Sequence, residues 1–365
     1  MKLLYATSIV QSGRANRMQV FAMARVFGKI LGNNFWLGSR DEKLQGDEFQ
    51  SLYFGDRKSY TLAFKYLKFS RNNNIDTIYC REGRILFFLI LLNKVFFRLK
   101  IKFAYEVHQI IEKGNVNLFV ERVLSFFVDK YVFVTKHLAD MYQKKYGLKN
   151  AQISVAPDGV DLIIFDISAS KEDAREKLDL PLDKKIIGYC GRFKTMGEDK
   201  GFFDILESLK YLPEDVVFTA MGGKPHHVDE FQAIADKMGL AERTIFRGHE
   251  AQSTVALYQK AFDVLLMPFP KTTHYSYYMS PMKMFEYMAG KRPIVASDLP
   301  SVREVLNENN AVLVESGNPK SLADGIKKVL ENSEFAQSIA NQAYEDVKEY
   351  TWEKRAERIL TYLKI

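Results

Sequence analysis

The segment Ser280–Ser297 places a helix start, a cation and a carboxylate in an order that could bind a nucleotide. Ser280 is a favourable N-cap residue, and Pro281 suits the first helical position, where its missing N–H costs no hydrogen bond. The free N–H groups of a helix N-terminus attract anions such as phosphate. Lys283 adds positive charge there, and Glu286, on the same face, could accept hydrogen bonds from ribose hydroxyls. The pattern predicts a nucleotide-diphosphate site; a surface helix with a Lys283–Glu286 pair is the alternative.

The rest of this segment has the pattern of one α/β unit. The helix is expected to end at Gly290, after which Pro293 leads into the apolar strand Ile294–Ala296. A helix followed directly by a short apolar strand is typical of a parallel sheet covered by helices. The helix is expected to be amphipathic, with Met282, Phe285 and Ala289 on one face and Lys283, Glu286, Tyr287 and Gly290 on the other.

Length and composition limit the classes of protein to which this chain can belong. A chain of 365 residues is too long for one typical domain, and 47% apolar with 27% charged residues describes a globular protein. Cys80 and Cys190 are the only cysteines, which excludes a disulfide framework or a cysteine metal cluster and fits a reducing compartment. We expect no signal peptide, and the longest apolar stretch, Ile85–Leu92, falls short of the roughly 20 residues of a membrane span. The expected location is cytoplasmic, soluble or peripheral on a membrane.

Charge is distributed unevenly along the chain. The net charge is +7, but residues 1–160 carry 25 Lys and Arg against 13 Asp and Glu, whereas residues 161–365 have a balance of −5. The run Asn93–Lys100 adds aromatic residues to the basic ones, and helical spacing can bring Lys94, Arg98 and partly Arg84 to one flank. We therefore expect the first half to face something anionic, with a membrane surface as the preferred partner. Recognised nucleic-acid motifs are missing, so no nucleic-acid partner is expected.

The chain reads as two series of alternating strands and helices. Short β-branched strands separated by helices predict doubly wound parallel sheets, with ligands at the carboxyl ends of the strands. A turn at Pro157–Gly159 precedes a charged helix starting near Ser170, which predicts a linker around residues 158–168. The expected strands are Leu3–Ala6, Thr77–Cys80, Phe103–Val107, Tyr131–Val134, Lys185–Cys190, Val216–Met221, Thr244–Arg247, Val264–Met267, Pro293–Ser297 and Ala311–Val314; the clearest expected helices are Gly201–Tyr211, His227–Met238 and Thr254–Ala261.

Six segments form an ordered set of motifs along the chain: Val155–Asp161, Gly188–Arg192, Asp199–Gly201, Arg247–His249, Phe285–Ala289 and Tyr350–Glu353. Taken together, these motifs resemble the retaining glycosyltransferases of family 4. The resemblance covers nearly the whole chain, and it implies the GT-B fold, in which two Rossmann-like domains face a central cleft. It implies an acceptor-binding domain over residues 1–160, a nucleotide-sugar-binding domain over 161–350, and a terminal helix, 351–365, that packs back on the first domain.

The resemblance assigns most site residues to the donor nucleotide. Arg192 and Lys200 match the basic pair that holds the donor diphosphate and offsets the charge that develops on the leaving group. Glu286 matches the carboxylate that binds the ribose hydroxyls. The remaining residues that the resemblance implies at the donor nucleotide and its diphosphate are Ser280, Met282, Lys283, Gly13 and His249.

Two further groups complete the implied site. His108, in the sequence Tyr105–His108 at a strand end, matches the family histidine near the sugar ring and the scissile bond; without the resemblance, a structural histidine is the alternative. Gly13 opens the loop that the family has near the donor phosphate and acceptor, with a plain turn as the alternative, and Arg14 and Asn16 are the acceptor candidates.

One departure from the family pattern leaves the donor-sugar contacts open. The family often carries two glutamates eight positions apart, and eight positions before Glu286 this chain has Tyr278. The usual glycine-rich turn is replaced by Met279–Pro281, and Pro281 cannot donate an N–H. The sugar hydroxyls could instead be oriented by Tyr278, Tyr277, His274 or Ser280.

The expected function is retaining transfer of a sugar from a UDP- or GDP-linked donor. The acceptor would be a glycan, lipid-linked, in bacterial surface polysaccharide or glycoconjugate synthesis. No Asp-x-Asp metal motif is present, so neither a metal nor another cofactor is expected. A two-carboxylate double displacement remains open as the mechanism. The alternatives are a nucleotide-sugar epimerase of the same fold and a non-catalytic nucleotide-sugar binder; a dinucleotide dehydrogenase would need a glycine fingerprint that residues 8–16 do not supply.

Overall fold

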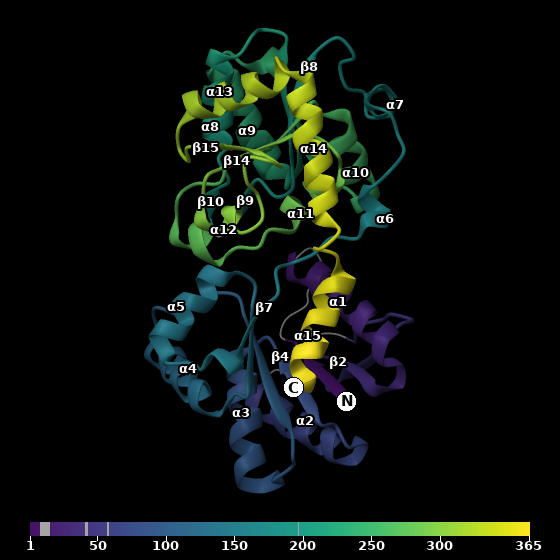
Figure 1. Ribbon diagram of the computed structural model, residues 1–365, viewed down its shortest axis with the longest axis vertical. Coiled ribbons are helices and arrows are strands. Elements are labelled where there is room, and N and C mark those ends of the chain that lie inside the picture. Colours follow the sequence, from purple (N-terminus) through teal and green to yellow (C-terminus); the bar gives the residue numbers. More distant parts are fainter. Residues whose placement is uncertain (8–14, 41–42, 57, 196) are drawn as a thin grey trace. The chain divides into compact units, whose positions relative to one another are not determined.

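The computed structural model describes the chain except residues 8–14, 41–42, 57 and 196, and the side chains of residues 15 and 16 (Figure 1). The described residues form two compact units. Unit 1 consists of Met1–Asp158 and Trp352–Ile365, and unit 2 consists of Gly159–Thr351. The last helix, α15 (Trp352–Lys364), therefore belongs to the same unit as the N-terminus, where it packs beside α1 (Ala15–Leu31).

Unit 1 is built on a seven-stranded sheet in the order β3-β2-β1-β4-β5-β6-β7, with every neighbouring pair parallel. The strands are β1 (Leu3–Ala6), β2 (Phe35–Ser39), β3 (Gln50–Tyr53), β4 (Thr77–Cys80), β5 (Lys102–Val107), β6 (Lys130–Phe133) and β7 (Ile153–Val155). Besides α1 and α15, the helices are η1 (Gly32–Asn34), α2 (Ser59–Asn73), α3 (Gly83–Leu92), η2 (Asn93–Phe97), α4 (Asn115–Phe127), α5 (Lys136–Tyr146) and η3 (Asn150–Gln152).

Unit 2 is built on a six-stranded parallel sheet in the order β12-β11-β8-β13-β14-β15. These strands are β8 (Lys185–Cys190), β11 (Val216–Gly223), β12 (Thr244–Gly248), β13 (Val264–Met267), β14 (Ile294–Ser297) and β15 (Val312–Val314); β9 (Lys194–Thr195) and β10 (Glu198–Asp199) form a separate antiparallel pair. The helices are α6 (Leu162–Phe165), α7 (Lys171–Lys177), α8 (Phe202–Ser208), η4 (Leu209–Tyr211), α9 (Pro225–Lys237), η5 (Ala241–Arg243), α10 (Gln252–Ala261), η6 (His274–Tyr278), α11 (Met282–Ala289), α12 (Pro300–Arg303), α13 (Pro319–Leu330) and α14 (Ser333–Val347).

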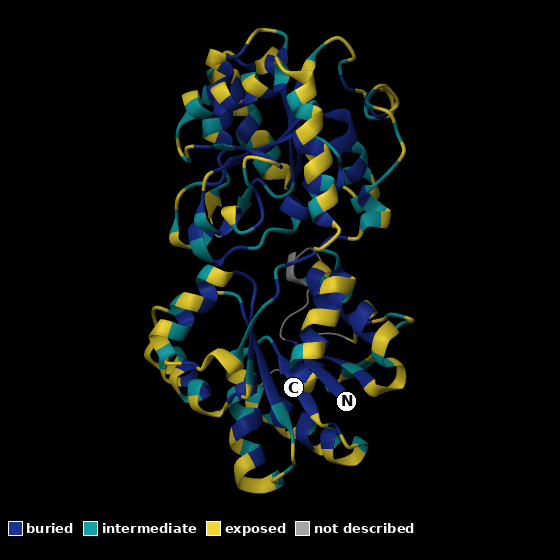
Figure 2. Cartoon of the chain, viewed as in Figure 1, coloured by how far each residue is buried: buried dark blue, intermediate teal, exposed yellow. Residues whose placement is uncertain are grey.

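The predicted fold class is confirmed, because both sheets are parallel and their strands are connected through helices. All ten expected strands are present within a residue or two of their expected ends. The buried strands carry the core, which Figure 2 shows as dark blue segments inside both units. In unit 2 the strand order reverses between β8 and β13, and ligands of doubly wound sheets bind at such a switch point.

The start and the faces of α11 differ from the prediction. Pro281 takes the N-cap position with an extended backbone, so that the helix begins at Met282 and Ser280 lies outside it. The expected end at Gly290 is confirmed. The helix is not amphipathic: six of its eight residues are buried, because α11 packs between the sheet of unit 2 and α14.

The apolar helix expected before residue 100 also ends too early to carry Arg84, Lys94 and Arg98 on one flank. Regular α3 ends at Leu92, and the chain continues as the π-helical turn η2. That turn ends at Arg98, whose backbone is left-handed, while the Asn93 side chain bonds the main chain of Leu99. Lys94 and Arg98 therefore do not continue one regular helix flank from Arg84. In the described part of the chain, no helix is both long enough and apolar enough to cross a membrane.

Candidate functional site

The carboxyl end of β8 in unit 2 is closed by tight backbone packing. Gly191 has a φ of 128°, and its N–H donates to the Met221 carbonyl on β11 at 2.8 Å. A Cβ on Gly222 would lie 2.7 Å from the Gly191 carbonyl oxygen, so a side chain there would force the two loops apart. Arg192 follows directly, which fixes its backbone at the switch point of the sheet.

A tyrosine on α11 joins that helix to the same strand end. The Tyr287 hydroxyl accepts a hydrogen bond from the Cys190 N–H at 2.8 Å and donates to the Cys190 carbonyl at 3.3 Å. Tyr287 is fully buried, and the burial raises the pKa of its hydroxyl well above the usual value. Because the ring spans from α11 to β8, it sets where the helix N-terminus lies relative to Arg192.

Lys200 is held by a loop whose shape depends on its neighbours. The Asp199 carboxylate accepts a hydrogen bond from the Phe202 N–H at 2.9 Å, which caps the start of α8. Gly201 has a φ of 89°, and a Cβ there would lie 1.8 Å from the Pro268 carbonyl oxygen. The loop therefore passes against the chain that leaves β13, and this contact fixes Lys200 beside the switch point.

Arg192, Lys200 and Lys283 form a cluster of three cations. Burial, followed by repulsion from Arg192, lowers the pKa of Lys200 to about 8. Burial, followed by repulsion from Lys200, holds the pKa of Lys283 well below its usual range. Like charges this close oppose one another's protonation, and a bound anion would relieve that repulsion. The structure thus brings Arg192, Lys200 and Lys283, three of the residues predicted at the donor diphosphate, close to one another.

Lys283 is the most unusual member of this cluster. Its residue is only 8% exposed, and its Nζ has no hydrogen-bond partner among the described residues. The Nζ lies 3.4 Å from the centroid of the Tyr189 ring, a cation–π contact, and beside Gly191, where a Cβ would be 3.0 Å away. The alternative of an exposed Lys283–Glu286 surface pair is therefore wrong, because the side chain points into the unit and not toward solvent.

Glu286 is half-buried on α11, near Lys283. Burial raises the pKa of its carboxyl group to about 7, although Lys283 acts in the opposite direction. Burial of a carboxyl group that is half ionised near neutral pH lowers the stability of the folded protein. Such a group is suited to a ligand that donates hydrogen bonds to it, as the two hydroxyls of a ribose would.

The four candidates for the donor sugar lie between β13 and α11. His274, Tyr277 and Tyr278 belong to η6, and Ser280 follows it. Burial, followed by repulsion from Lys200, lowers the pKa of His274, so His274 lies within electrostatic reach of the cation cluster. Tyr278 is buried, whereas the other three are half-buried. His274, Tyr277, Tyr278 and Ser280 therefore stay the predicted candidates for the donor-sugar contacts.

His249 and Met282 are two other donor-site candidates. His249 is exposed in the loop after β12, which is an edge strand two positions from β8. At the usual spacing of about 4.8 Å between strands, this is about 10 Å away across the same edge of the sheet. Met282 is half-buried in the first turn of α11.

His108 belongs to unit 1, where it follows β5 among buried charges. Its Nε2 lies 2.8 Å from Nη2 of Arg81 and 3.0 Å from Oε1 of Glu106. Burial, followed by repulsion from Arg81, lowers the pKa of His108 below its usual value. Gly13 and Arg14 lie outside the described residues, as does the side chain of Asn16, so their predicted contacts to phosphate and acceptor remain predictions.

Sequence reasoning missed the residues that position these groups. Glu106 was not predicted as a site residue, although an acidic residue inside the otherwise apolar strand Phe103–Val107 is a signal of a buried partner. Its partner Arg81 directly follows β4 and its partner Arg355 lies in α15, and no local pattern joins such distant positions. Tyr189 beneath Lys283 could not be found either, because a tyrosine in an apolar strand looks like an ordinary core residue.

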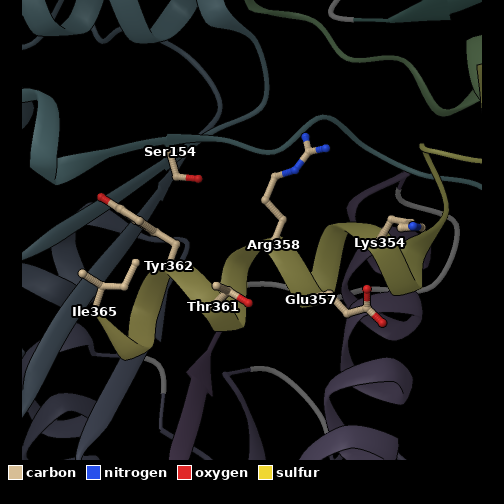
Figure 3. A pocket seen from close by; sticks show the side chains of 7 residues that line it. All are labelled: Ser154, Lys354, Glu357, Arg358, Thr361, Tyr362 and Ile365. Carbon is tan, nitrogen blue, oxygen red and sulfur yellow. The ribbon is translucent and has the colours of Figure 1, made fainter.

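Neither the metal-site geometry of the described residues nor the groove along α15 adds a residue to the candidate site. In the described ranges, no group of three or more His, Cys, Asp or Glu side chains is arranged so that it could hold a metal ion. One open groove of about 390 Å³ lies along α15 in unit 1, and it contains none of the predicted site residues (Figure 3). It is lined by Ser154, Lys354, Glu357, Arg358, Thr361, Tyr362 and Ile365.

Comparison with known proteins identifies the class. The family named Glycosyl transferases group 1 matches residues 170–346, and Glycosyltransferase Family 4 matches residues 40–163. The structure of Anabaena HepE in complex with UDP superposes with a TM-score of 0.80 over 100% of both chains at 17% identity. The complex of the same protein with UDP-glucose gives 0.77 over 100% of this chain and 99% of that one, also at 17% identity. These likenesses establish a GT-B fold.

The chain belongs to the group 1, family 4 glycosyltransferases. A D-inositol 3-phosphate glycosyltransferase of Xylanimonas cellulosilytica is 27% identical over 241 residues, which are 64% of this chain and 56% of that protein. The putative teichuronic acid biosynthesis glycosyltransferase TuaC of Bacillus subtilis is 26% identical over 237 residues, 64% of this chain and 55% of that protein. The match thus spans little more than half the length of these curated relatives.

Proposed function

We propose that this chain transfers a sugar from a nucleotide-diphosphate sugar to a glycan acceptor, with retention of the anomeric configuration. The observation that carries the proposal is the cluster of Arg192, Lys200 and Lys283 beside Glu286 at the switch point of unit 2. Three cations are suited to bind the negative charges of a diphosphate, and a carboxylate one turn further along α11 is suited to accept hydrogen bonds from a ribose. The binding of UDP and UDP-glucose by the fold neighbour from Anabaena supports a nucleotide sugar as the donor.

The proposed chemistry follows from the charges of this cluster. The bond between the anomeric carbon and the diphosphate breaks, and the negative charge that develops on the leaving oxygen is stabilised by Arg192, Lys200 and Lys283. The acceptor hydroxyl attacks from the face that the diphosphate leaves, and its proton passes to the departing phosphate oxygen. Atoms and charges therefore balance without a covalent sugar–protein intermediate, and anomeric configuration is retained.

The acceptor that we propose is a lipid-linked glycan in bacterial surface polysaccharide or glycoconjugate synthesis, taken up at an anionic membrane. The support is an aromatic and basic surface of unit 1, formed by α3, η2 and α4. Phe96 and Phe126 are 70% and 73% exposed there, and Nζ of Lys94 lies 3.9 Å from the Phe127 ring centroid. Exposed apolar residues bordered by cations suit the lipid–water interface. The other large exposed apolar residues of these elements are Leu91, Val95, Val116, Phe119 and Phe127.

The donor assignment is tested by ligand-induced stabilisation. Thermal unfolding of the full chain would be followed with UDP, GDP and a panel of their sugars, because a ligand that binds the folded state raises the melting temperature. We expect a shift with one nucleotide diphosphate and a larger one with its matching sugar. Absence of any shift, with Lys283→Met indistinguishable from the parent, would remove the donor site.

Transfer itself is tested with the donor that this panel identifies. Incubation with bacterial lipid-linked glycans should produce a new glycoside, and proton NMR of the anomeric signal should show the configuration of the donor. A nucleotide-sugar epimerase would instead change the sugar without an acceptor, and a non-catalytic binder would leave the donor intact. Activity is expected to survive EDTA; a loss that a divalent ion restores would contradict the metal-free mechanism.

The membrane proposal is tested separately by sedimentation with vesicles. Binding should require anionic lipid, weaken at high salt and fall when Phe96 and Phe126 are replaced by serine. A matched control replaces the exposed Phe203 of unit 2 by serine. Equal binding to neutral vesicles, or no binding to either kind, would contradict an anionic membrane partner.

A further inference from the structure

The buried charges around His108 form a network that the proposed transfer chemistry does not use. Its centre is the Glu106 carboxylate on β5, whose side chain is fully buried. Oε1 of Glu106 accepts a hydrogen bond from Nη2 of Arg355 at 2.9 Å, and Oε2 accepts one from the Tyr5 hydroxyl at 3.3 Å and lies 3.9 Å from Nε of Arg81. The carboxylate therefore has two guanidinium partners, one beyond β4 and one on the C-terminal helix α15.

Arg355 also connects Pro157 and Asp158, the last residues of the first segment of unit 1, to this network. Its Nε donates to the Pro157 carbonyl at 3.0 Å and lies 3.8 Å from Oδ1 of Asp158. Asp158 in turn accepts a hydrogen bond from the Gln19 amide, and the Gln19 carbonyl oxygen accepts one from Arg81 at 2.6 Å. The charged groups that surround His108 thus come from the ends of β4 and β5, the chain after β7, and α15.

The two contacts of His108 require opposite positions of the ring proton. A carboxylate 3.0 Å from Nε2 would ordinarily indicate a carboxylate–histidine pair, in which the histidine acts as a general base. Nη2 of Arg81, however, lies 2.8 Å from the same nitrogen, and a guanidinium can only donate. Nε2 can accept from Arg81 only if its lone pair is free, and it then cannot donate to Glu106.

The charge balance of the network favours the contact with Arg81. Burial acts to raise the pKa of Glu106, but Arg81 and Arg355 outweigh it and hold that pKa well below its usual range. The negative charge of Glu106 is therefore already compensated by the two arginines. Burial and Arg81 lower the pKa of His108, against the opposing effects of Glu106 and Asp158, so the ring is neutral at pH 7.

We propose that Arg81, with Glu106 held in place by Arg355, fixes His108 as the neutral tautomer with its proton on Nδ1, so that His108 is a hydrogen-bond donor and not a general base. Among the described residues, none makes a hydrogen bond to Nδ1. The side chain is 32% exposed, which leaves this N–H available to an oxygen of the sugar. Arg81, Glu106 and Arg355 are positioning residues, and α15 contributes to the site through Arg355. The catalytic part of this inference rests on the proposed function; the tautomer does not.

The tautomer is measured directly by nitrogen NMR of the full chain. The protein contains six histidines, so selective ¹⁵N-histidine labelling gives few signals, and the spectrum of His108→Gln identifies those of His108. We expect a protonated Nδ1 and an unprotonated Nε2 at pH 7. In Arg81→Met the proton should move to Nε2, because Glu106 then becomes the available partner, and the pKa of His108 should rise. A protonated Nε2 in the parent protein would overturn the proposal.

The contribution of Arg355 is read from the titration of His108. Arg355→Met should raise the pKa of His108, because Glu106 loses one of its two cations, and Arg355→Lys should restore it. If Arg355→Met does not fold, the charge-balanced double variant Glu106→Gln with Arg355→Met replaces it, and His108 should keep its proton on Nδ1 there. The matched control is Arg358→Met on the same helix, since Arg358 lines the surface groove in Figure 3. Loss of stability without any change in the His108 titration would show that Arg355 is only structural.

Activity separates a donor from a base. Glutamine retains an N–H donor, whereas aspartate can only accept. If His108 donates, His108→Gln should lose about tenfold or less in kcat, the effect of one hydrogen bond, and His108→Asp should lose more. If it is a base, His108→Asp should retain more activity than His108→Gln, which should fall by about 10²–10⁴. Should no transfer be found at all, the proposed function fails while the NMR result still decides the tautomer.

Discussion

Replacing Glu286 by glutamine should make the protein more stable at pH 8 and weaken its binding of a nucleotide. Burial raises the pKa of this carboxyl group from 4.5 to about 7 in the folded chain. The folded state therefore binds the proton more tightly than the unfolded state, and stability falls as the pH rises from 4.5 to about 7. Above pH 7 the folded protein carries the full cost of a poorly solvated carboxylate.

The size of this cost follows from the two pKa values. Their difference corresponds to about 3 kcal/mol, and partial exposure of the side chain reduces this to about 1–3 kcal/mol. For a unit of this size, each kcal/mol changes the melting temperature by about 2–4 °C. Glu286→Gln should thus melt about 2–12 °C above the parent at pH 8. At pH 5, where Glu286 is largely uncharged in the folded parent, most of this difference in melting temperature should be absent.

The same change should weaken binding of the nucleotide. A charged acceptor of two ribose hydrogen bonds is worth about 1.5–3 kcal/mol, which corresponds to a roughly ten- to hundredfold higher Kd for the nucleoside diphosphate. Calorimetric titration at pH 8 measures this value, and melting at pH 5 and pH 8 measures the stability. Glu331→Gln, at an exposed position in the same unit, is the control. A variant that is less stable than the parent at pH 8, or an unchanged Kd, would refute the reasoning.

Three further predictions concern the cation cluster and its loop. Arg192→Ala should lower kcat by about 10²–10³ with little change in donor affinity, because its partner charge grows as the glycosidic bond breaks; a higher Kd at constant kcat would contradict this. In Lys200→Arg the alkaline limb of the kcat/KM profile, expected near pH 8, should move upward because arginine stays protonated; an unmoved limb would exclude Lys200 as its source. Gly201→Ala should melt well below Gly197→Ala, since both glycines have a left-handed φ but only a Cβ at Gly201 would meet backbone, 1.8 Å from the Pro268 oxygen.

Most strands of the two sheets could be predicted because each one is a recognisable apolar run in the sequence. Strands such as Thr77–Cys80 and Val264–Met267 are short apolar runs bounded by polar residues, and a parallel sheet buried on both faces requires such runs. The strands that the sequence did not predict are β2, β3 and β7 of the seven-stranded sheet and the two-residue strands β9 and β10. β3 and β7 are edge strands that contain no fully buried residue, and their short sequences carry only a weak apolar signal. β2 is partly hidden because Gly38 lies inside it, where a Cβ would meet the Tyr66 side chain.

The residues of the proposed donor site could be selected from the sequence, but their burial and packing could not. The spacing of Lys283 and Glu286 indicated that they share a helix, and the resemblance supplied Arg192 and Lys200. Burial of Lys283 was not predictable, because a lysine on a short helix is ordinarily exposed. It follows from the packing of α11 on every side, which in turn depends on α14 and on the Tyr287 hydroxyl at the end of β8.

The burial of Lys283 is unfavourable for the folded chain. Among the described residues its Nζ has no hydrogen-bond partner, and it lies next to two other cations and a carboxyl group with a raised pKa, which lowers the stability of the folded chain. A fold can retain such an arrangement when a ligand of opposite charge relieves it. A diphosphate would restore full protonation of Lys200 and Lys283, and a ribose would donate to ionised Glu286. If this chain binds a nucleotide diphosphate as proposed, relief of these unfavourable charges would contribute to its selectivity for that ligand.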